Sequence, residues 1–211
     1  MNPGYLALLL VSMLIILLLS GWRNVIFPET SAKTVALFIA GWLVGHWITV
    51  SVGGIRINMS FAAELLFTAC LLKAVGSRRR AAHLLSLGVI LAAFHFLLME
   101  IYRVNPFLPA FGIVVDAALS LSALTIVLNR HPYQQLFVLS VALIAGETSF
   151  AYLHRDEVPF VPGNAEFSDK WWLTLFVART ATIVIETARR IGRRKVHSWT
   201  NHIFRKDENR S

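Results

Sequence analysis

Charged residues are scarce in this sequence, and their scarcity argues against a soluble fold. They make up 15% of the 211 residues, whereas a soluble domain usually carries about 25%. Hydrophobic residues make up 56% and form long continuous runs. A helix needs roughly 20 apolar residues to cross a bilayer, so these runs predict a protein that spans a membrane several times.

Cysteine and the common catalytic motifs are nearly missing as well. The one cysteine, Cys70, excludes an intramolecular disulfide and a Cys-based metal motif, and we interpret it as a small packing residue. Neither HExxH nor GxSxG occurs. The apolar runs do not alternate at period two, which argues against strands and a membrane β-barrel. The sequence shows no internal repeat of the kind found in inverted-repeat transporters.

Seven apolar runs are predicted to be membrane-spanning helices. They cover residues 5–22, 34–53, 57–76, 81–102, 106–128, 133–153 and 171–188. No Lys or Arg precedes the first run and no small-x-small cleavage site follows it. We therefore interpret this run as a retained helix with its N-terminus outside, and not as a signal peptide.

The connections between the runs are short. Pro28 predicts a turn, and the two glycines in residues 52–56 predict a tight turn. Pro106 suits the first turn of the fifth helix. Residues 154–170 form the longest predicted loop.

The distribution of positive charge predicts the orientation. Seven spans place fifteen of the 20 Lys and Arg residues on one side, among them the cluster Arg78 to Arg80 and the eight after the last span. The other side receives four, and Arg179 lies inside a span. Cytoplasmic loops carry the excess of Lys and Arg, so we expect the N-terminus outside and the C-terminus in the cytoplasm.

Tryptophans lie at the ends of several runs. Trp22, Trp171 and Trp172 are predicted to sit in the aromatic belts at the membrane interfaces. Trp42 and Trp47 lie deeper in the second run, where we expect them to pack against other helices.

Six ionisable residues inside the spans are the candidate ligand-binding residues, because such residues are rare in a bilayer and mark functional sites by default. A rise of 1.5 Å per residue places all six roughly 9–15 Å below the outer surface, each on a different helix. We therefore predict one polar layer made of His46, Glu64, His95, Asp116, Glu147 and Arg179.

Three interpretations of this layer stay open. In the first, Arg179 pairs with Glu64, Asp116 or Glu147, and the network only holds the helices together. In the second, the layer lines an outward-facing pocket for a small ligand or ion, because three acids face one Arg. In the third, the histidines and acids hold a metal in an intramembrane hydrolase. The lack of paired ligand spacing disfavours this enzyme, and no cofactor is predicted.

The positively charged C-terminal residues predict a lipid partner. The net charge of +8 is concentrated at the ends of the runs and in residues 189–211, where anionic lipid headgroups explain it and nucleic acid is not needed. The overall length, the GWRN stretch from Gly21 to Asn24 and this basic tail resemble the YphA-like family of small membrane proteins from spore-forming bacteria. No functional residue carries over from that resemblance.

Together these observations predict an all-α polytopic membrane helix bundle in a bacterial plasma membrane. Residues 1–188 form its seven-helix transmembrane domain, and residues 189–211 form a basic cytoplasmic tail. We expect the protein to be a non-enzymatic membrane protein that binds a small ligand or ion, with a structural or assembly role as the alternative.

Overall fold

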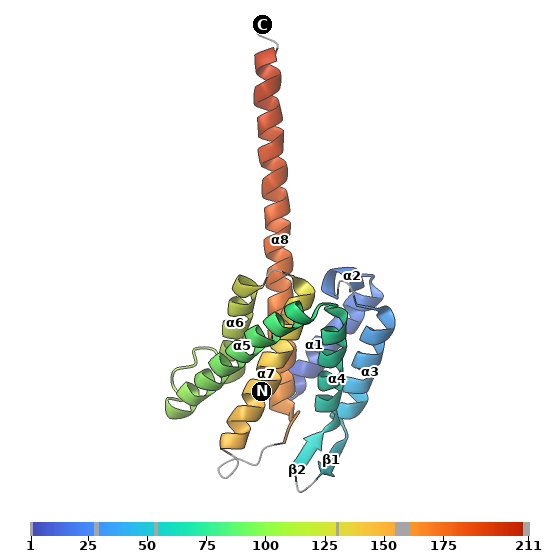
Figure 1. The fold of residues 1–211 in the computed structure, drawn as a ribbon, viewed down its shortest axis with the longest axis vertical. Coiled ribbons are helices and arrows are strands. Elements are labelled where there is room, and N and C mark those ends of the chain that lie inside the picture. Colours follow the sequence, from blue (N-terminus) through green and yellow to red (C-terminus); the bar gives the residue numbers. More distant parts are fainter. Residues whose placement is uncertain (1, 28–29, 53–54, 130, 155–160, 209–211) are drawn as a thin grey trace.

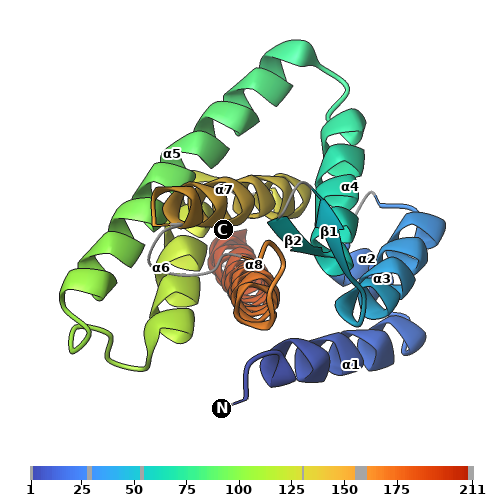
Figure 2. The same ribbon diagram turned by 90° about the horizontal axis from the view of Figure 1, so that it is seen from below.

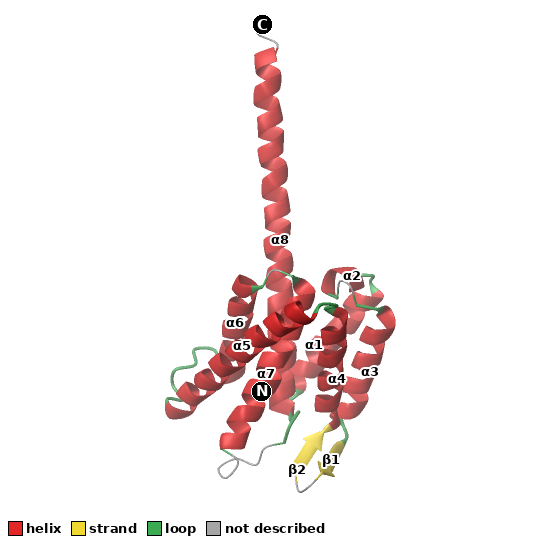
Figure 3. Cartoon of the chain, viewed as in Figure 1, coloured by secondary structure: helices red, strands yellow, loops and turns green. Residues whose placement is uncertain are grey.

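The fold is almost entirely helical (Figure 3). The structure is a computed structural model that describes residues 2–27, 30–52, 55–129, 131–154 and 161–208. Within these ranges the helices and strands are α1 (Tyr5–Leu19), α2 (Arg23–Ile26), α3 (Ala32–His46), β1 (Thr49–Val52), β2 (Ile55–Asn58), α4 (Met59–Ala74), α5 (Arg78–Val104), α6 (Ile113–Leu128), α7 (Pro132–Leu153) and α8 (Ala165–Glu208). The predicted all-α class is confirmed, apart from one short hairpin.

Each of the seven predicted runs overlaps one main helix of the structure. In the part of the chain that the structure describes, α5 and α7 are long and apolar enough to cross a membrane, at 27 and 22 residues. Helices α1, α3 and α6 are apolar but shorter, at 15 or 16 residues. The apolar runs therefore located the helices. Among the described residues, however, only α5 and α7 are long and apolar enough for a full span.

Helix α8 forms the centre of the bundle. Seen along its axis, it is surrounded by the other helices (Figure 2), and α1, α6 and α7 pack directly against it. Helix α5 packs on α7, and α3 pairs with α4. The bundle has two ends, which we call the hairpin end, where β1 and β2 lie, and the tail end, where α8 leaves the bundle (Figure 1).

A β-hairpin replaces the end of the second predicted span. Strands β1 and β2 pair antiparallel, with Thr49 opposite Asn58 and Val52 opposite Ile55. Helix α3 ends at His46, so the boundary predicted at residue 53 is wrong. The stretch from Thr49 to Asn58 has β-branched residues alternating with polar ones around two glycines, which is a hairpin pattern. Its apolar content hid this pattern within the longer run.

Two other helix boundaries differ from the prediction. Helix α6 begins at Ile113, after Gly112 with a φ of 103°, so Pro106 lies in the preceding connection and not in the first helical turn. Helix α8 begins at Ala165, because the Asn164 side chain accepts a hydrogen bond from Phe167 N at 2.7 Å and satisfies a free N–H of the first turn. The loop predicted for residues 154–170 therefore ends earlier, before Ala165. The turn predicted at Pro28 lies outside the described residues.

The predicted boundary at residue 188 falls inside a continuous helix. Helix α8 has 44 residues and continues past the bundle toward the C-terminus (Figure 1). Its first half packs in the bundle, and its second half contains most of the basic tail.

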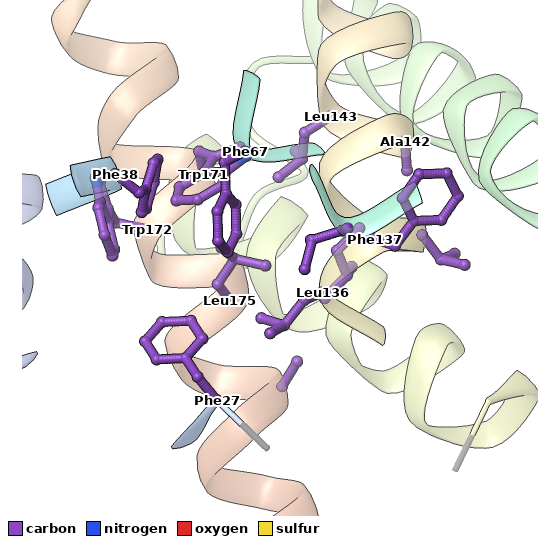
Figure 4. Close-up of a cluster of buried hydrophobic side chains, with 14 of the residues drawn as sticks. Phe27, Phe38, Phe67, Leu136, Phe137, Ala142, Leu143, Trp171, Trp172 and Leu175 are labelled. Carbon is purple, nitrogen blue, oxygen red and sulfur yellow. The ribbon is translucent and has the colours of Figure 1, made fainter. Parts of the chain in front are cut away.

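Aromatic side chains from three helices form the central part of the core (Figure 4). Phe38 stacks on Phe67 with ring centroids 4.2 Å apart, and its ring also contacts Trp171 and Trp172. Both tryptophans are buried, at 0% and 4% exposure, so their predicted place in an interface belt is wrong. They pack against α3 because α8 begins earlier than its apolar run indicates.

Candidate functional site

A buried ionic cluster joins three helices near the hairpin end. Glu147 on α7 accepts a hydrogen bond from Lys170 Nζ on α8 at 2.6 Å, and its second oxygen lies 2.8 Å from His95 Nε2 on α5. His95 and Lys170 are 0% and 2% exposed. Gly146 makes room for the imidazole, because a Cβ there would lie 2.9 Å from His95 Cδ2.

Both hydrogen bonds to the Glu147 carboxylate come from within this cluster. Lys170 and Glu147 carry opposite charges, and their charged atoms lie 2.6 Å apart. His95 Nδ1 has no hydrogen-bond partner among the described residues. Both oxygens of Glu147 are occupied, so this cluster holds α5, α7 and α8 together as it stands.

Lys170 belongs to the buried cluster, whereas the prediction places it at the edge of a loop. The sequence carries a signal that places it in a helix. Asn164 is a favourable N-cap residue just before the apolar run, and Glu166 lies four residues before Lys170, at 3.6 Å. A helix beginning at Ala165 puts Lys170 in its second turn, within reach of α7.

Glu64 forms a second buried site, between α3 and α4. It is 0% exposed, and its Oε1 accepts a hydrogen bond from Trp42 Nε1 at 3.0 Å. Its Oε2 has no hydrogen-bond partner among the described residues. The Trp42 contact ties the two helices together, and the unpartnered oxygen makes Glu64 sensitive to any loss of that donor.

Asp116 and His46 have other surroundings. Asp116 is half-buried in the first turn of α6 and accepts from Phe111 N at 3.3 Å. His46 stacks on Trp42 with ring centroids 5.1 Å apart, whereas His95 contacts Glu147. Over the described ranges, no group of three or more His, Cys, Asp and Glu residues is placed to hold a metal ion.

Arg179 lies on α8 and bonds to main-chain carbonyls. Its Nε donates to Ile26 O at 2.9 Å, and its Nη2 donates to Val25 O. These are free carbonyls of the short helix α2, which satisfy a cation well. The predicted pairing of Arg179 with Glu64, Asp116 or Glu147 is therefore wrong.

Arg179 does not pair with these acids because of its position along α8. It follows the first residue of the helix by 14 positions, or about 21 Å, and so lies near the tail end beside α2. Lys170 lies near the start of the helix and meets Glu147 near the hairpin end. The predicted single layer thus divides, with Arg179 separated from the acids it was expected to contact.

A cavity of about 310 Å³ lies next to Arg179. Its walls come chiefly from α1, the α2 segment and α8, and they are almost wholly apolar. Residues of α1 from Leu10 to Leu17 form one side, and residues of α8 from Trp171 to Val184 form the other. Several of these side chains appear in Figure 4. The volume is near the lower limit of about 300–1,000 Å³ that is usual for ligand sites.

The cavity is open on one side. Three of its lining residues, Met13, Trp22 and Val184, are 44%, 50% and 61% exposed. Arg179 is 6% exposed, and its Nη1 has no hydrogen-bond partner among the described residues. An incompletely satisfied cation thus borders an apolar cavity whose mouth is formed by α1, Trp22 and α8.

Asp169 fixes α1 on α8, and these two helices form most of the cavity wall. Its two carboxylate oxygens accept from Gly4 N at 2.7 Å and Ala7 N at 2.6 Å. These N–H groups belong to the first turn of α1, where a negative charge stabilises a helix. No local sequence signal indicates this contact, because the partners are more than 160 positions apart.

The outer surface of the bundle is rich in exposed apolar side chains. Large apolar side chains are exposed on many helices, among them Leu37 at 76%, Leu66 at 69%, Ile90 at 60% and Val127 at 78%. Buried charges inside and apolar side chains outside are the arrangement that a lipid environment requires. The fold is that of a helical integral membrane protein.

The comparison with protein families agrees with this class. The chain belongs to the family of YphA-like integral membrane proteins, whose family model matches residues 26–203. The predicted resemblance to that family is confirmed. The searches of curated proteins and of solved structures found no match.

Proposed function

We propose that this protein crosses the bacterial plasma membrane seven times, with its N-terminus outside and its C-terminus in the cytoplasm. Support comes from seven main helices and from fifteen Lys and Arg residues on one side against four on the other. A 15-residue helix is about 22 Å long, less than the roughly 30 Å of the hydrocarbon core. Local thinning of the bilayer accommodates such short helices at modest cost.

A reporter fused after Ser211 tests this topology. A reporter that is active only in the cytoplasm agrees with the proposal. Activity of an externally active reporter at the same position would contradict the orientation.

The protein acts, in this proposal, by binding a ligand in the cavity between α1 and α8. The observation that carries it is a cavity of about 310 Å³ with apolar walls and a buried Arg179 whose Nη1 is unpartnered. Apolar pockets with a few polar groups are the usual form of ligand sites. The mouth opens between transmembrane helices, so the ligand enters from the bilayer.

The remaining residues of the predicted polar layer have structural roles in this proposal. Glu147 contacts His95 and Lys170 through its two oxygens, and Glu64 ties α4 to α3. They position the helices, whereas Arg179 borders the ligand. A purely structural protein, the alternative, would leave the cavity without an occupant.

Quenching of tryptophan fluorescence tests occupancy. Trp171 and Trp172 line the cavity and are almost inaccessible from outside. A brominated acyl chain in the surrounding bilayer quenches them efficiently when it enters the cavity. We expect such quenching in the reconstituted full chain with Trp22, Trp47 and Trp199 replaced by Phe, and less of it when Leu14→Phe and Ile183→Phe fill the cavity.

The control is Ile90→Phe, which adds the same ring on an exposed position of α5. It should leave the quenching unchanged. Equal quenching in the filled variant and in the native protein would favour the structural alternative.

The basic tail is the second contact with lipid in this proposal. Eight Lys and Arg residues follow residue 188, a number typical of segments that bind anionic headgroups beside a transmembrane helix. Tail binding to anionic vesicles should weaken steeply with added salt.

A further inference from the structure

The cavity is asymmetric along its length. Its lining on α8 extends from Trp171 to Val184, a distance of about 20 Å. The deep part is aromatic and apolar, with Trp171, Trp172 and Phe38 in mutual contact. The other part holds Arg179 and Trp22, next to α2. One end therefore suits a hydrocarbon chain, and the other suits a polar group.

The charged end of the cavity lies at the tail end of the bundle. Arg179 bonds to the carbonyls of α2, a helix that begins with Arg23. Lys33 near the start of α3 and Arg78 at the start of α5 belong to the same end. Excess positive charge attracts the anionic lipids of that leaflet, and basic pockets between transmembrane helices bind their headgroups.

The length of the cavity fits one leaflet. Half of a hydrocarbon core of about 30 Å is about 15 Å, close to the roughly 12 Å of α8 that separate Trp171 from Arg179. A chain that enters between Met13 and Val184 lies along α8, with its end at the aromatic cluster. Its headgroup then lies level with Arg179.

Arg179 supplies the charge that selects the headgroup. Two of its nitrogens donate to carbonyls, which are neutral, and its buried Nη1 has no hydrogen-bond partner among the described residues. Glu186, seven residues further along α8, is the acid whose charge acts on Arg179. A guanidinium group prefers phosphate or carboxylate oxygens as hydrogen-bond acceptors. Resting on the proposed function, we infer that the occupant is one acyl chain of an anionic phospholipid from the tail-end leaflet, with its phosphate drawn to Arg179.

The experiment compares two brominated lipids in the reconstituted full chain. One is a neutral phosphatidylcholine and the other an anionic phosphatidylglycerol, each with the same brominated chains and diluted into unbrominated phosphatidylcholine. Trp22, Trp47 and Trp199 are replaced by Phe in every sample, which leaves Trp171 and Trp172 at the cavity and the buried Trp42, whose ring lies 5.3 Å from Trp172. The readout is the mole fraction of brominated lipid that gives half-maximal quenching.

The anionic lipid should reach half-maximal quenching at a mole fraction about fivefold lower than the neutral lipid, the effect expected of one Arg beside the headgroup. Arg179→Gln should remove this preference, and Arg179→Lys should keep part of it. Arg189→Gln is the matched control, since it removes the same charge from an exposed position of α8. It should retain the preference.

Each opposite result overturns a defined part of the argument. Equal quenching by both lipids in the native protein overturns the anionic occupant but leaves the cavity as a binding site. Loss of the preference in Arg189→Gln to the same extent as in Arg179→Gln overturns the role of Arg179. No quenching by either lipid overturns the occupant and the proposed function together. The comparison in the native protein stands even if Arg179→Gln fails to fold.

Discussion

Replacing Lys170 by Met removes a positive charge from a buried carboxylate while keeping most of the side-chain volume. Lys170 Nζ lies 2.6 Å from Glu147 Oε1, and the two side chains are 3% and 15% exposed. At that distance and an effective dielectric constant near 20, the attraction is about 6 kcal/mol. Desolvation of both ions opposes it, so we expect Lys170→Met to destabilise the protein by about 3–5 kcal/mol.

The measurement is the unfolding temperature in detergent, followed by tryptophan fluorescence. For a chain of this size about 1 kcal/mol corresponds to roughly 2–4 °C, so the expected loss is about 6–20 °C. Lys73→Met makes the same change at an exposed position of α4 and should shift the free energy of unfolding by less than about 0.5 kcal/mol.

A second substitution separates the charge from the packing. Adding Glu147→Gln to Lys170→Met removes the unpaired carboxylate, and a neutral replacement of a buried ion pair costs little. The double variant should recover at least half of the lost stability. If Lys170→Met is no worse than Lys73→Met, or if the double variant recovers nothing, the reasoning about this cluster is refuted.

Three further substitutions test other contacts in the bundle. Asp169→Ala removes the acceptor for the first turn of α1 and should cost about 1–2 kcal/mol, with faster amide exchange in that turn; unchanged exchange would refute the capping role. Gly146→Ala should lower the unfolding temperature, because its Cβ would lie 2.9 Å from neighbouring atoms, whereas Gly41→Ala, with 3.9 Å of room, should be tolerated. Trp42→Phe leaves the Glu64 carboxyl without a donor and should cost about 1–3 kcal/mol; in the Glu64→Gln background the same change should cost clearly less, and an equal cost would show that packing alone is lost.

Much of the fold could be predicted because the signals are local. A run of about 20 apolar residues is stable in a bilayer as a helix wherever it lies in a fold, and each of the seven runs overlaps one. Helix boundaries were less predictable. The hairpin from Thr49 to Asn58 was hidden by its apolar content, and the start of α8 depended on the cap at Asn164.

The candidate site was predicted in its residue types but not in its contacts. His95 and Glu147 do meet, as residues of one polar layer should. Their third partner, Lys170, was assigned to a loop. Arg179 was matched with acids because carboxylates are visible in a sequence, whereas the carbonyls of α2 that it binds are present in every residue and carry no sequence signal.

The sequence by itself determined that this protein belongs to a membrane, since scarce charge and long apolar runs leave no other solvent for its helices. It also determined which residues would be costly to bury. Only the tertiary structure decided which partners these buried charged residues contact, because the pairing depends on how the helices are positioned along one another. Helix α8 begins six residues before its apolar run, so Lys170 lies in the helix beside Glu147. Arg179 lies further along the same helix, beside α2. The contact of Asp169 with α1 then closes one side of the cavity, whose walls come from segments far apart in the sequence.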